Sequence, residues 1–209
     1  MSETSEGVET TRWQPGTKVR LVTEHFVLQS LRPEDIDENY VSWWQDPVVM
    51  RGLSTKLVRA TLQQHRQRVA KQFDDRNNFH WGVFDRAKGR LIGFVTIFFN
   101  PRHGVALMNT VIGDRSYWGK TILMELKDAG MPFIFEELGA EKITGQAMAR
   151  NHATVFINKA MGLEVEGVLR KEWRMEDGTR ADVLSFGLLR DDWRKRIAEH
   201  SGNTGDETA

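Results

Sequence analysis

The segment from Gly113 to Lys120 joins a strand-like apolar run to an apolar helix, and it has the residue types of a phosphate-binding loop. Unpaired backbone N–H groups at a helix N-terminus, together with the helix dipole, attract anions such as a pyrophosphate. Lys120 adds positive charge, and Gly119 allows a close approach of the ligand. Strand–turn–helix junctions with a glycine are common in α/β proteins, so a purely structural role stays open at this point.

A second candidate is the short helix that Asn151 begins and Gly162 ends. Asparagine is a favoured N-cap and glycine a favoured helix end, so the punctuation alone explains both residues. The placement is more informative, because this helix directly follows a strand that itself follows the phosphate-loop helix. Strand, loop, helix, strand and capped helix in this order would build a groove for a long phosphorylated cofactor.

The elements that must position these segments follow from the hydrophobic periodicity. Strands are expected at residues 25–31, 80–84, 90–99, 105–112, 142–148, 165–171 and 181–189. Helices are expected at residues 32–44, 62–73, 118–138 and 151–161. Gly130 and Pro132 should kink or split the third helix. The sum is an α+β fold, with a mixed, mostly antiparallel sheet of six to seven strands and helices on both faces.

Composition narrows the function classes. The 209 residues contain 29 Lys plus Arg and 29 Asp plus Glu, so no global field favours nucleic acid or a membrane surface. There is no cysteine, which removes disulfides and thiolate sites and fits a cytoplasmic protein, and no metal site is expected. The polar ends predict disordered tails at 1–18 and 199–209 around a single domain at 19–198.

Four stretches together resemble one family. Tyr117-Trp118-Gly119-Lys120 resembles the opening of the cofactor loop in the GNAT superfamily of acetyl-CoA-dependent acyltransferases, in the branch similar to the RimJ/RimL ribosomal-protein acetyltransferases. The other three stretches are Leu31–Asp35, Trp44–Pro47 and Gly178–Trp193. They resemble the opening helix and the closing strand and tail of that branch, so the resemblance covers roughly residues 25 to 195 and implies the GNAT fold.

The resemblance implies acetyl-CoA as co-substrate and a set of residues that hold it. These cofactor-binding positions are Val111, Ile112, Trp118, Gly119, Lys120, Thr121, Ile122, Asn151 and Asn158. The chain departs from the family pattern at Thr121 and Leu123, where glycine and then glycine or alanine are usual. It departs again at Asn158, where many relatives have a tyrosine that protonates the leaving thiolate.

Acyl transfer to an amine needs a positioned carbonyl, a partner for the developing oxyanion and a neutral amine. In this family the strand before the phosphate loop diverges from its neighbour and its free N–H groups polarise the carbonyl, which here implies residues 109–112. Asn109 is the candidate catalytic residue, because it could position the amine or a bridging water. Met108 stands where relatives often have an acid. Other candidate bases are Asp114, His80 and His103.

Trp43 and Trp44 lie on the helix that often roofs the acceptor pocket in this family. Adjacent residues point to different helix faces, so one tryptophan is expected in the core and the other on the pocket wall. Aromatic walls suit sugars, nucleotides and apolar side chains alike, so they do not name the acceptor.

The sequence therefore predicts an N-acyltransferase that moves an acetyl or short acyl group from acyl-CoA to a primary amine by direct attack. Acceptors in view are a protein N-terminus, an amino sugar or another small amine, and the protein is expected as a monomer or homodimer. Two alternatives stay open: a catalytically degenerate domain that binds a ligand or partner, and an acyltransferase that uses a non-CoA donor.

Overall fold

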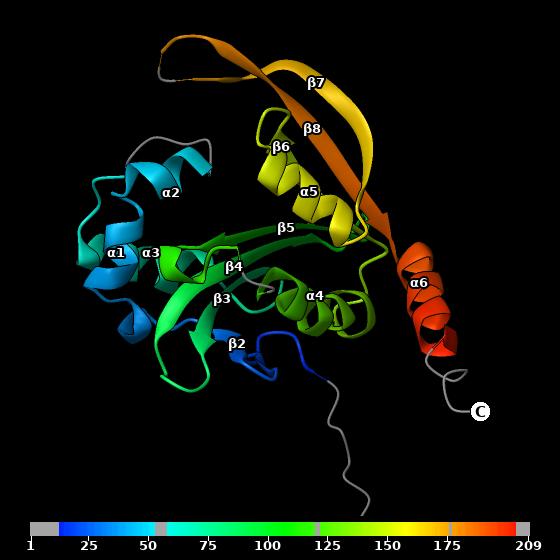
Figure 1. Ribbon diagram of the computed structural model, residues 1–209. Helices are drawn as coiled ribbons and strands as arrows, with labels where there is room; N and C mark the ends of the chain where they lie inside the picture. The colour runs from blue at the N-terminus through cyan, green and yellow to red at the C-terminus, as the bar shows by residue number, and fades with distance from the viewer. Residues whose placement is uncertain (1–12, 53–57, 120–121, 176, 204–209) are drawn as a thin grey trace, which may run out of the picture.

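The computed structural model describes residues 13–52, 58–119, 122–175 and 177–203 (Figure 1). Its strands are β1 (Arg20–Val22), β2 (Phe26–Ser30), β3 (Asn78–Asp85), β4 (Leu91–Asn100), β5 (Val105–Ile112), β6 (Lys142–Met148), β7 (Glu164–Arg174) and β8 (Arg180–Leu189). They form one sheet in the order β1-β2-β3-β4-β5-β6-β8-β7. The α+β class is confirmed, but the expected six to seven strands are corrected to eight. Three-residue β1 was missed because it is too short to show an alternating pattern.

All neighbouring strands in the sheet run antiparallel except β5 and β6, which are parallel. The parallel pair follows from the connection, because a helix returns the chain to the starting end of the sheet before β6 begins. Every residue of β5 has a partner on β4, from Gly93 opposite Ile112 to Asn100 opposite Val105. The loop before α4 follows β5, and the helix capped by Asn151 follows β6. Both candidate segments therefore come directly after the two strands of the parallel pair.

The helices cover both faces of the sheet, as predicted. They are η1 (Pro33–Asp35), α1 (Glu38–Trp43), α2 (Pro47–Gly52), α3 (Leu62–Gln72), η2 (Arg115–Tyr117), α4 (Ile122–Pro132), η3 (Phe133–Glu137), α5 (His152–Ala160) and α6 (Arg190–Asn203). The expected helix at 32–44 is split in two: Ile36 is extended and fully buried, and Asp37 then caps α1 by accepting from the N–H of Tyr40. Within the described residues, no helix is long and apolar enough to cross a membrane.

The long helix predicted at 118–138 also divides. Its α-helical part ends at Pro132, and the chain continues as the π-helical turn η3. Proline has no N–H to donate to the preceding turn, which explains why the regular hydrogen-bonding pattern changes there. The predicted kink is confirmed, and it keeps Phe133 and Phe135 buried against the sheet.

Each face of the sheet has its own hydrophobic cluster. The larger cluster joins Trp81 and Phe186 of the sheet to Ile122 and Leu126 of α4. The smaller cluster lies on the opposite face, where α1 and α3 cover the sheet; its members include Tyr40, Trp43, Val69, Phe94 and Val111. Alternate residues of a strand point to opposite faces, so neighbours such as Phe94 and Val95 belong to different clusters. The two faces can therefore carry different chemistry.

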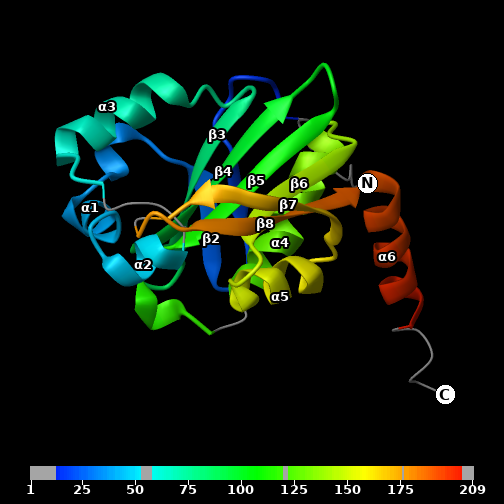
Figure 2. The ribbon, with the colours of Figure 1, turned by 90° about the horizontal axis from the view of Figure 1, so that it is seen from above.

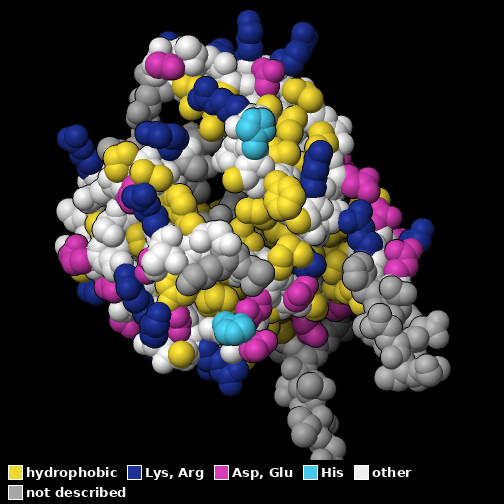
Figure 3. All heavy atoms as spheres, viewed as in Figure 1, with side chains coloured by type: hydrophobic (Ala, Val, Ile, Leu, Met, Phe, Trp, Pro, Cys, Tyr) yellow, Lys and Arg dark blue, Asp and Glu magenta, His cyan; other side chains and the backbone are white. Residues whose placement is uncertain are grey.

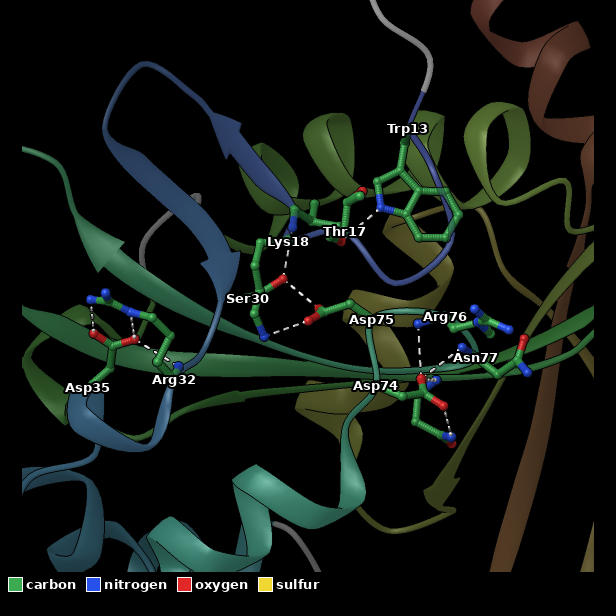
Figure 4. A network of polar contacts seen from close by, with 12 residues as sticks. Trp13, Thr17, Lys18, Ser30, Arg32, Asp35, Asp74, Asp75, Arg76 and Asn77 are labelled. Atoms are coloured by element: carbon green, nitrogen blue, oxygen red, sulfur yellow. Dashed lines mark hydrogen bonds and ion pairs between the residues drawn. The ribbon is translucent and has the colours of Figure 1, made fainter.

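The folded part begins earlier than expected. Trp13 packs edge-on against Phe133 with ring centroids 5.2 Å apart. The carboxylate of buried Asp75 accepts from Ser30 Oγ at 2.5 Å and from Lys18 Nζ at 2.7 Å, as Figure 4 shows. These contacts tie the segment before β1 to the sheet, so the predicted tail at 1–18 ends too late in the chain.

The β7–β8 hairpin rises from the sheet and extends toward the end of the molecule where α1 and α2 lie (Figures 1 and 2). β7 continues beyond the predicted Lys171 to Arg174, through a register shift between Leu169 and Trp173. Lys171 adopts φ +54° within that shift. At the other end of the hairpin, α6 runs to Asn203, past the domain end expected at residue 198.

Candidate active site

The parallel strands β5 and β6 diverge after a short paired stretch. They pair only from Val105 opposite Lys142 to Leu107 opposite Thr144, while β5 continues to Ile112. On the β5 edge that faces β6, the backbone groups beyond Leu107 therefore have no strand partner. The divergence expected along residues 109–112 is confirmed, and it opens the sheet beside Asn109.

A groove of about 190 Å³ occupies this divergence. It is lined by β5, β6, the start of α4, the groove-facing side of α5 and one residue of β7. The lining residues are Met108, Asn109, Thr110, Leu123, Gly145, Gln146, Ala147, Met148, Asn151, Thr154, Ile157, Asn158, Met161 and Trp173. Three residues predicted for the site therefore come together from two elements: Asn109 from β5, and Asn151 and Asn158 from the N-cap and body of α5.

Asn151 is the N-cap of α5, as predicted. Its side-chain oxygen accepts from the N–H of Thr154 at 3.2 Å. Gly162 ends the helix region with φ +93°, a conformation that favours glycine. α5 has no fully buried residue, and Thr154, Ile157 and Asn158 turn toward the groove. One side of this short helix is therefore available to a ligand.

The loop before α4 is held by its aromatic residues. The hydroxyl of buried Tyr117 donates to the carboxylate of Asp85 in the β3–β4 hairpin, and Lys88 Nζ lies 3.2 Å from the same hydroxyl. The bond to Asp85 raises the pKa of Tyr117, and it lowers the pKa of the Asp85 carboxyl. Trp118 donates from its indole N–H to the carbonyl of Ile112 at 2.7 Å. Both aromatic side chains of the loop therefore anchor it to the sheet through hydrogen bonds.

The remaining predicted cofactor positions differ in what they can offer. Gly119 has φ +73° and open space where a side chain would be, in line with close approach of a ligand. Lys120 and Thr121 lie outside the described residues. Ile122 is 3% exposed and belongs to the larger core cluster, so only its backbone can face a ligand. Val111 is likewise a core residue, in the smaller cluster on the opposite face.

The three alternative bases do not line the groove. Burial holds the pKa of His80 at about 3, far below its usual value, and both ring nitrogens lack partners among the described residues. Asp114 caps η2 by accepting from the N–H of Ser116 and lies 3.0 Å from Arg90. His103 is exposed in the turn between β4 and β5. The groove's described lining contains no carboxylate.

Of the two adjacent tryptophans, one lies in the core, as predicted, but neither is among the described residues that line the groove. Trp43 is 4% exposed and packs against Gly113, at the end of β5. Trp44 is only partly buried and stacks on Phe94 with centroids 5.6 Å apart. Trp43 therefore belongs to the core, and Trp44 lies at the edge of the α1/α3 face.

Sequence reasoning missed several groove residues, among them Gly145, Gln146 and Trp173. Gly145 and Gln146 follow Thr144, the last residue of β6 that pairs with β5, and the end of this pairing leaves no local pattern in the sequence. Trp173 comes from the far edge of the sheet, where the predicted strand ended too early. Its approach to the groove depends on the shape of the hairpin.

Comparisons with known proteins agree with this geometry. A sheet opened at one parallel pair, with a capped helix beside the opening, is the arrangement expected of an acyl-CoA-dependent acyltransferase. The family model described as "Acetyltransferase (GNAT) domain" matches residues 25–164. This chain belongs to the GNAT acetyltransferase family.

The individual proteins that resemble this chain do so at low sequence identity. The chain is 28% identical over 137 residues to a probable N-acetyltransferase, YjcK, of Bacillus subtilis (strain 168), covering 64% of this chain and 72% of that protein. A spermidine N-acetyltransferase from Vibrio cholerae, solved in complex with CoA and spermine, superimposes with a TM-score of 0.73 at 20% identity, covering 81% of this chain and 98% of that one. A ribosomal-protein-S5-alanine acetyltransferase from Vibrio fischeri gives a TM-score of 0.68 at 18% identity, covering 84% and 98%. At these identities the two structures support the shared fold alone.

Proposed function

We propose that this protein is an N-acetyltransferase that transfers an acetyl group from acetyl-CoA to a primary amine by direct attack, in the RimJ/RimL-like branch of its family. The observation that carries the proposal is the divergence of β5 from β6 beside the capped start of α5. Strand edges with free N–H and C=O groups suit an extended ligand that carries amides, as the arm of CoA does. The groove residues therefore fit this co-substrate.

The residues have separable tasks. Asn151, Asn158 and the side of α5 that faces the groove would hold the arm of the cofactor, and the loop anchored by Tyr117 and Trp118 would hold its phosphates. Acetyl-CoA supplies the acetyl group as an activated thioester. Backbone N–H groups of β5 that face the gap are positioned to donate to a carbonyl oxygen placed there.

Asn109 is exposed at the divergence and is the proposed positioning group for the amine. An amide cannot take up the proton of an ammonium group, so the amine has to lose its proton to water. As the new C–N bond forms, the attacking nitrogen releases a second proton to solvent, the C–S bond breaks, and the thiolate takes up a proton from solvent. Because solvent takes the amine proton, we expect activity to rise with pH until the amine is largely neutral.

Calorimetric titration with acetyl-CoA tests the proposal. We expect micromolar binding by the wild type and about tenfold weaker binding by Asn151→Ala. Asn151→Ser is the matched control, because serine also caps helices but lacks the amide. If Asn151→Ser binds like the wild type, Asn151 acts only as a cap. Absence of binding by the wild type would overturn the proposal.

A degenerate binding domain is the second candidate, and the groove's lack of a carboxylate among its described lining residues favours it. Binding of acetyl-CoA without acetylation of any amine in a broad screen would support this candidate. A non-CoA donor predicts the reverse pattern: weak acetyl-CoA binding, but transfer from an acylated carrier protein.

A further inference from the structure

Two histidines are buried on the face of the sheet that α1 and α3 cover. His65 of α3 is 2% exposed and His80 of β3 is 4% exposed. Both ring nitrogens of His80 and Nε2 of His65 lack hydrogen-bond partners among the described residues. Their neighbours are aromatic, with the His80 ring 4.9 Å from Phe94 and the His65 ring 5.7 Å from Trp44. Unpartnered buried polar atoms are costly, so several in one place need an explanation.

Arg68 of α3 stands at the exposed edge of this cluster. Its guanidinium lies 5.7 Å from the centre of the Trp44 ring, and its Nε donates to Gln72 at 2.9 Å. Neither partner is a carboxylate. Burial is the main cause that lowers the pKa values of His65 and His80, and the positive charge of Arg68 lowers both further. Its positive field is therefore felt inside the cluster without a described acid to neutralise it.

Acids on the neighbouring elements are engaged elsewhere. Asp37 caps α1, Asp74 accepts three backbone N–H groups of the turn before β3, and Asp75 pairs with Lys18. Glu38 lines a separate surface groove with Arg59. Figure 3 shows a hollow between the α1/α2 side and the α5/β7 side of the molecule, with Lys and Arg side chains in dark blue on the α1/α2 side.

Strand register connects this cluster to the divergence. His80 lies opposite Thr96, and Thr96 lies opposite Asn109, so the three side chains share one face of β3, β4 and β5. Two inter-strand spacings separate the first from the last, which is about 10 Å. Asn109 is exposed and Thr96 is half-buried, so this row leads from the groove toward Arg68 and Trp44.

We propose that Arg68, stacked on Trp44, binds an anionic group of the acceptor, and that the acceptor is a small primary amine carrying a carboxylate or phosphate at its far end from the amine. The proposal rests on the proposed function, because it assumes that the amine is acetylated beside Asn109. Guanidinium groups bind carboxylate and phosphate through paired N–H donors, and stacking on an aromatic ring fixes their orientation. The positive charge of Arg68 would repel a polyamine, which carries positive charges of its own.

Matched amines test the proposal. Glucosamine 6-phosphate is compared with glucosamine, and 6-aminohexanoate with hexylamine, by titration into the protein with CoA present. The wild type should prefer the anionic member of at least one pair by about tenfold. Phenylalanine against phenethylamine is the positional control, since its carboxylate adjoins the amine and should bring little gain.

Variants assign the preference to Arg68. Arg68→Gln should reduce the preference to about onefold, and Lys71→Gln, an equal charge change at an exposed position on the same helix, should retain it. No binding of either anionic member, equal binding within both pairs, or a preference that survives Arg68→Gln would overturn the inference. Acetyl-CoA titration separates the two proposals, because normal binding there leaves the proposed function standing when the anion preference fails.

Discussion

The two sides of the β5–β6 divergence are built by different means. The proposed donor side, between α4 and α5, depends on the backbone: an early end of strand pairing, a helix cap and a glycine-containing loop. The proposed acceptor side, under α1 and α3, depends on particular side chains, among them Arg68 and Trp44. Backbone features tolerate sequence change, whereas a side-chain site changes with each substitution. The proposed donor site should therefore tolerate substitution better than the proposed acceptor site.

The largest expected effect breaks the packing of the acceptor side. A Cβ at position 113 would lie 2.0 Å from the buried ring of Trp43. Gly113→Val should therefore lower the free energy of unfolding by about 3 kcal/mol, measured by urea denaturation. Gly167→Val is the control, because a Cβ at Gly167 meets nothing within 4 Å. Equal stabilities of the two variants would contradict this packing.

A smaller effect is expected in the pH dependence of stability, and it arises from His80 on the α1/α3 face. Burial holds the folded-state pKa of His80 at about 3, against 6.5 for a free histidine. Between these values the unfolded chain binds a proton that the folded chain does not, so the free energy of unfolding falls as pH falls. From pH 7 to pH 5 His80 should account for a loss of about 2 kcal/mol. Burial also lowers the pKa of His65, so His65 also makes the free energy of unfolding fall as the pH falls.

The measurement is urea denaturation at a series of pH values. His80→Phe should flatten the loss of stability between pH 7 and pH 5, because it removes the buried group that must stay neutral. His103→Gln, at an exposed position, should leave the slope unchanged. An unchanged slope in His80→Phe would show that the acid sensitivity arises elsewhere.

The smallest expected effect concerns acetyl-CoA binding on the proposed donor side. A Cβ at Gly145 would lie 3.8 Å from the carbonyl oxygen of Met108, so a methyl group fits but a longer side chain must enter the groove. Gly145→Leu should weaken acetyl-CoA binding about tenfold in calorimetry, while Gly145→Ala binds normally. If Gly145→Leu binds as tightly as the wild type, acetyl-CoA does not occupy this part of the groove.

Local patterns predicted much of the fold. The strand at 142–148 and the N-cap at Asn151 are found where the sequence places them, because strand alternation and helix caps are properties of neighbouring residues. The kink at Pro132 is equally local. Errors arose where tertiary contacts decide: β1 exists because β2 pairs with it, and Trp13 packs against the core because Phe79 of β3 and Phe133 of η3 lie beside it.

The candidate site was predicted less completely for the same reason. Family-like motifs marked Asn109, Asn151 and Asn158, and the groove brings these three together. Trp173 joins them from the edge strand, which no local pattern indicates. Arg68 read as an ordinary residue on the polar side of an amphipathic helix. Its proposed role depends on the position of its guanidinium over the Trp44 ring, which only the packing of α3 creates.

By itself the sequence determined the order of elements, the caps and breaks that bound them, and the family to which they belong. These features arise from interactions within a few residues of chain. Only the tertiary structure decided where β5 leaves β6, which described buried histidine nitrogens lack partners, and which arginine lies over Trp44. Such features depend on pairing and packing between segments far apart in the chain, where small differences in geometry outweigh local preference.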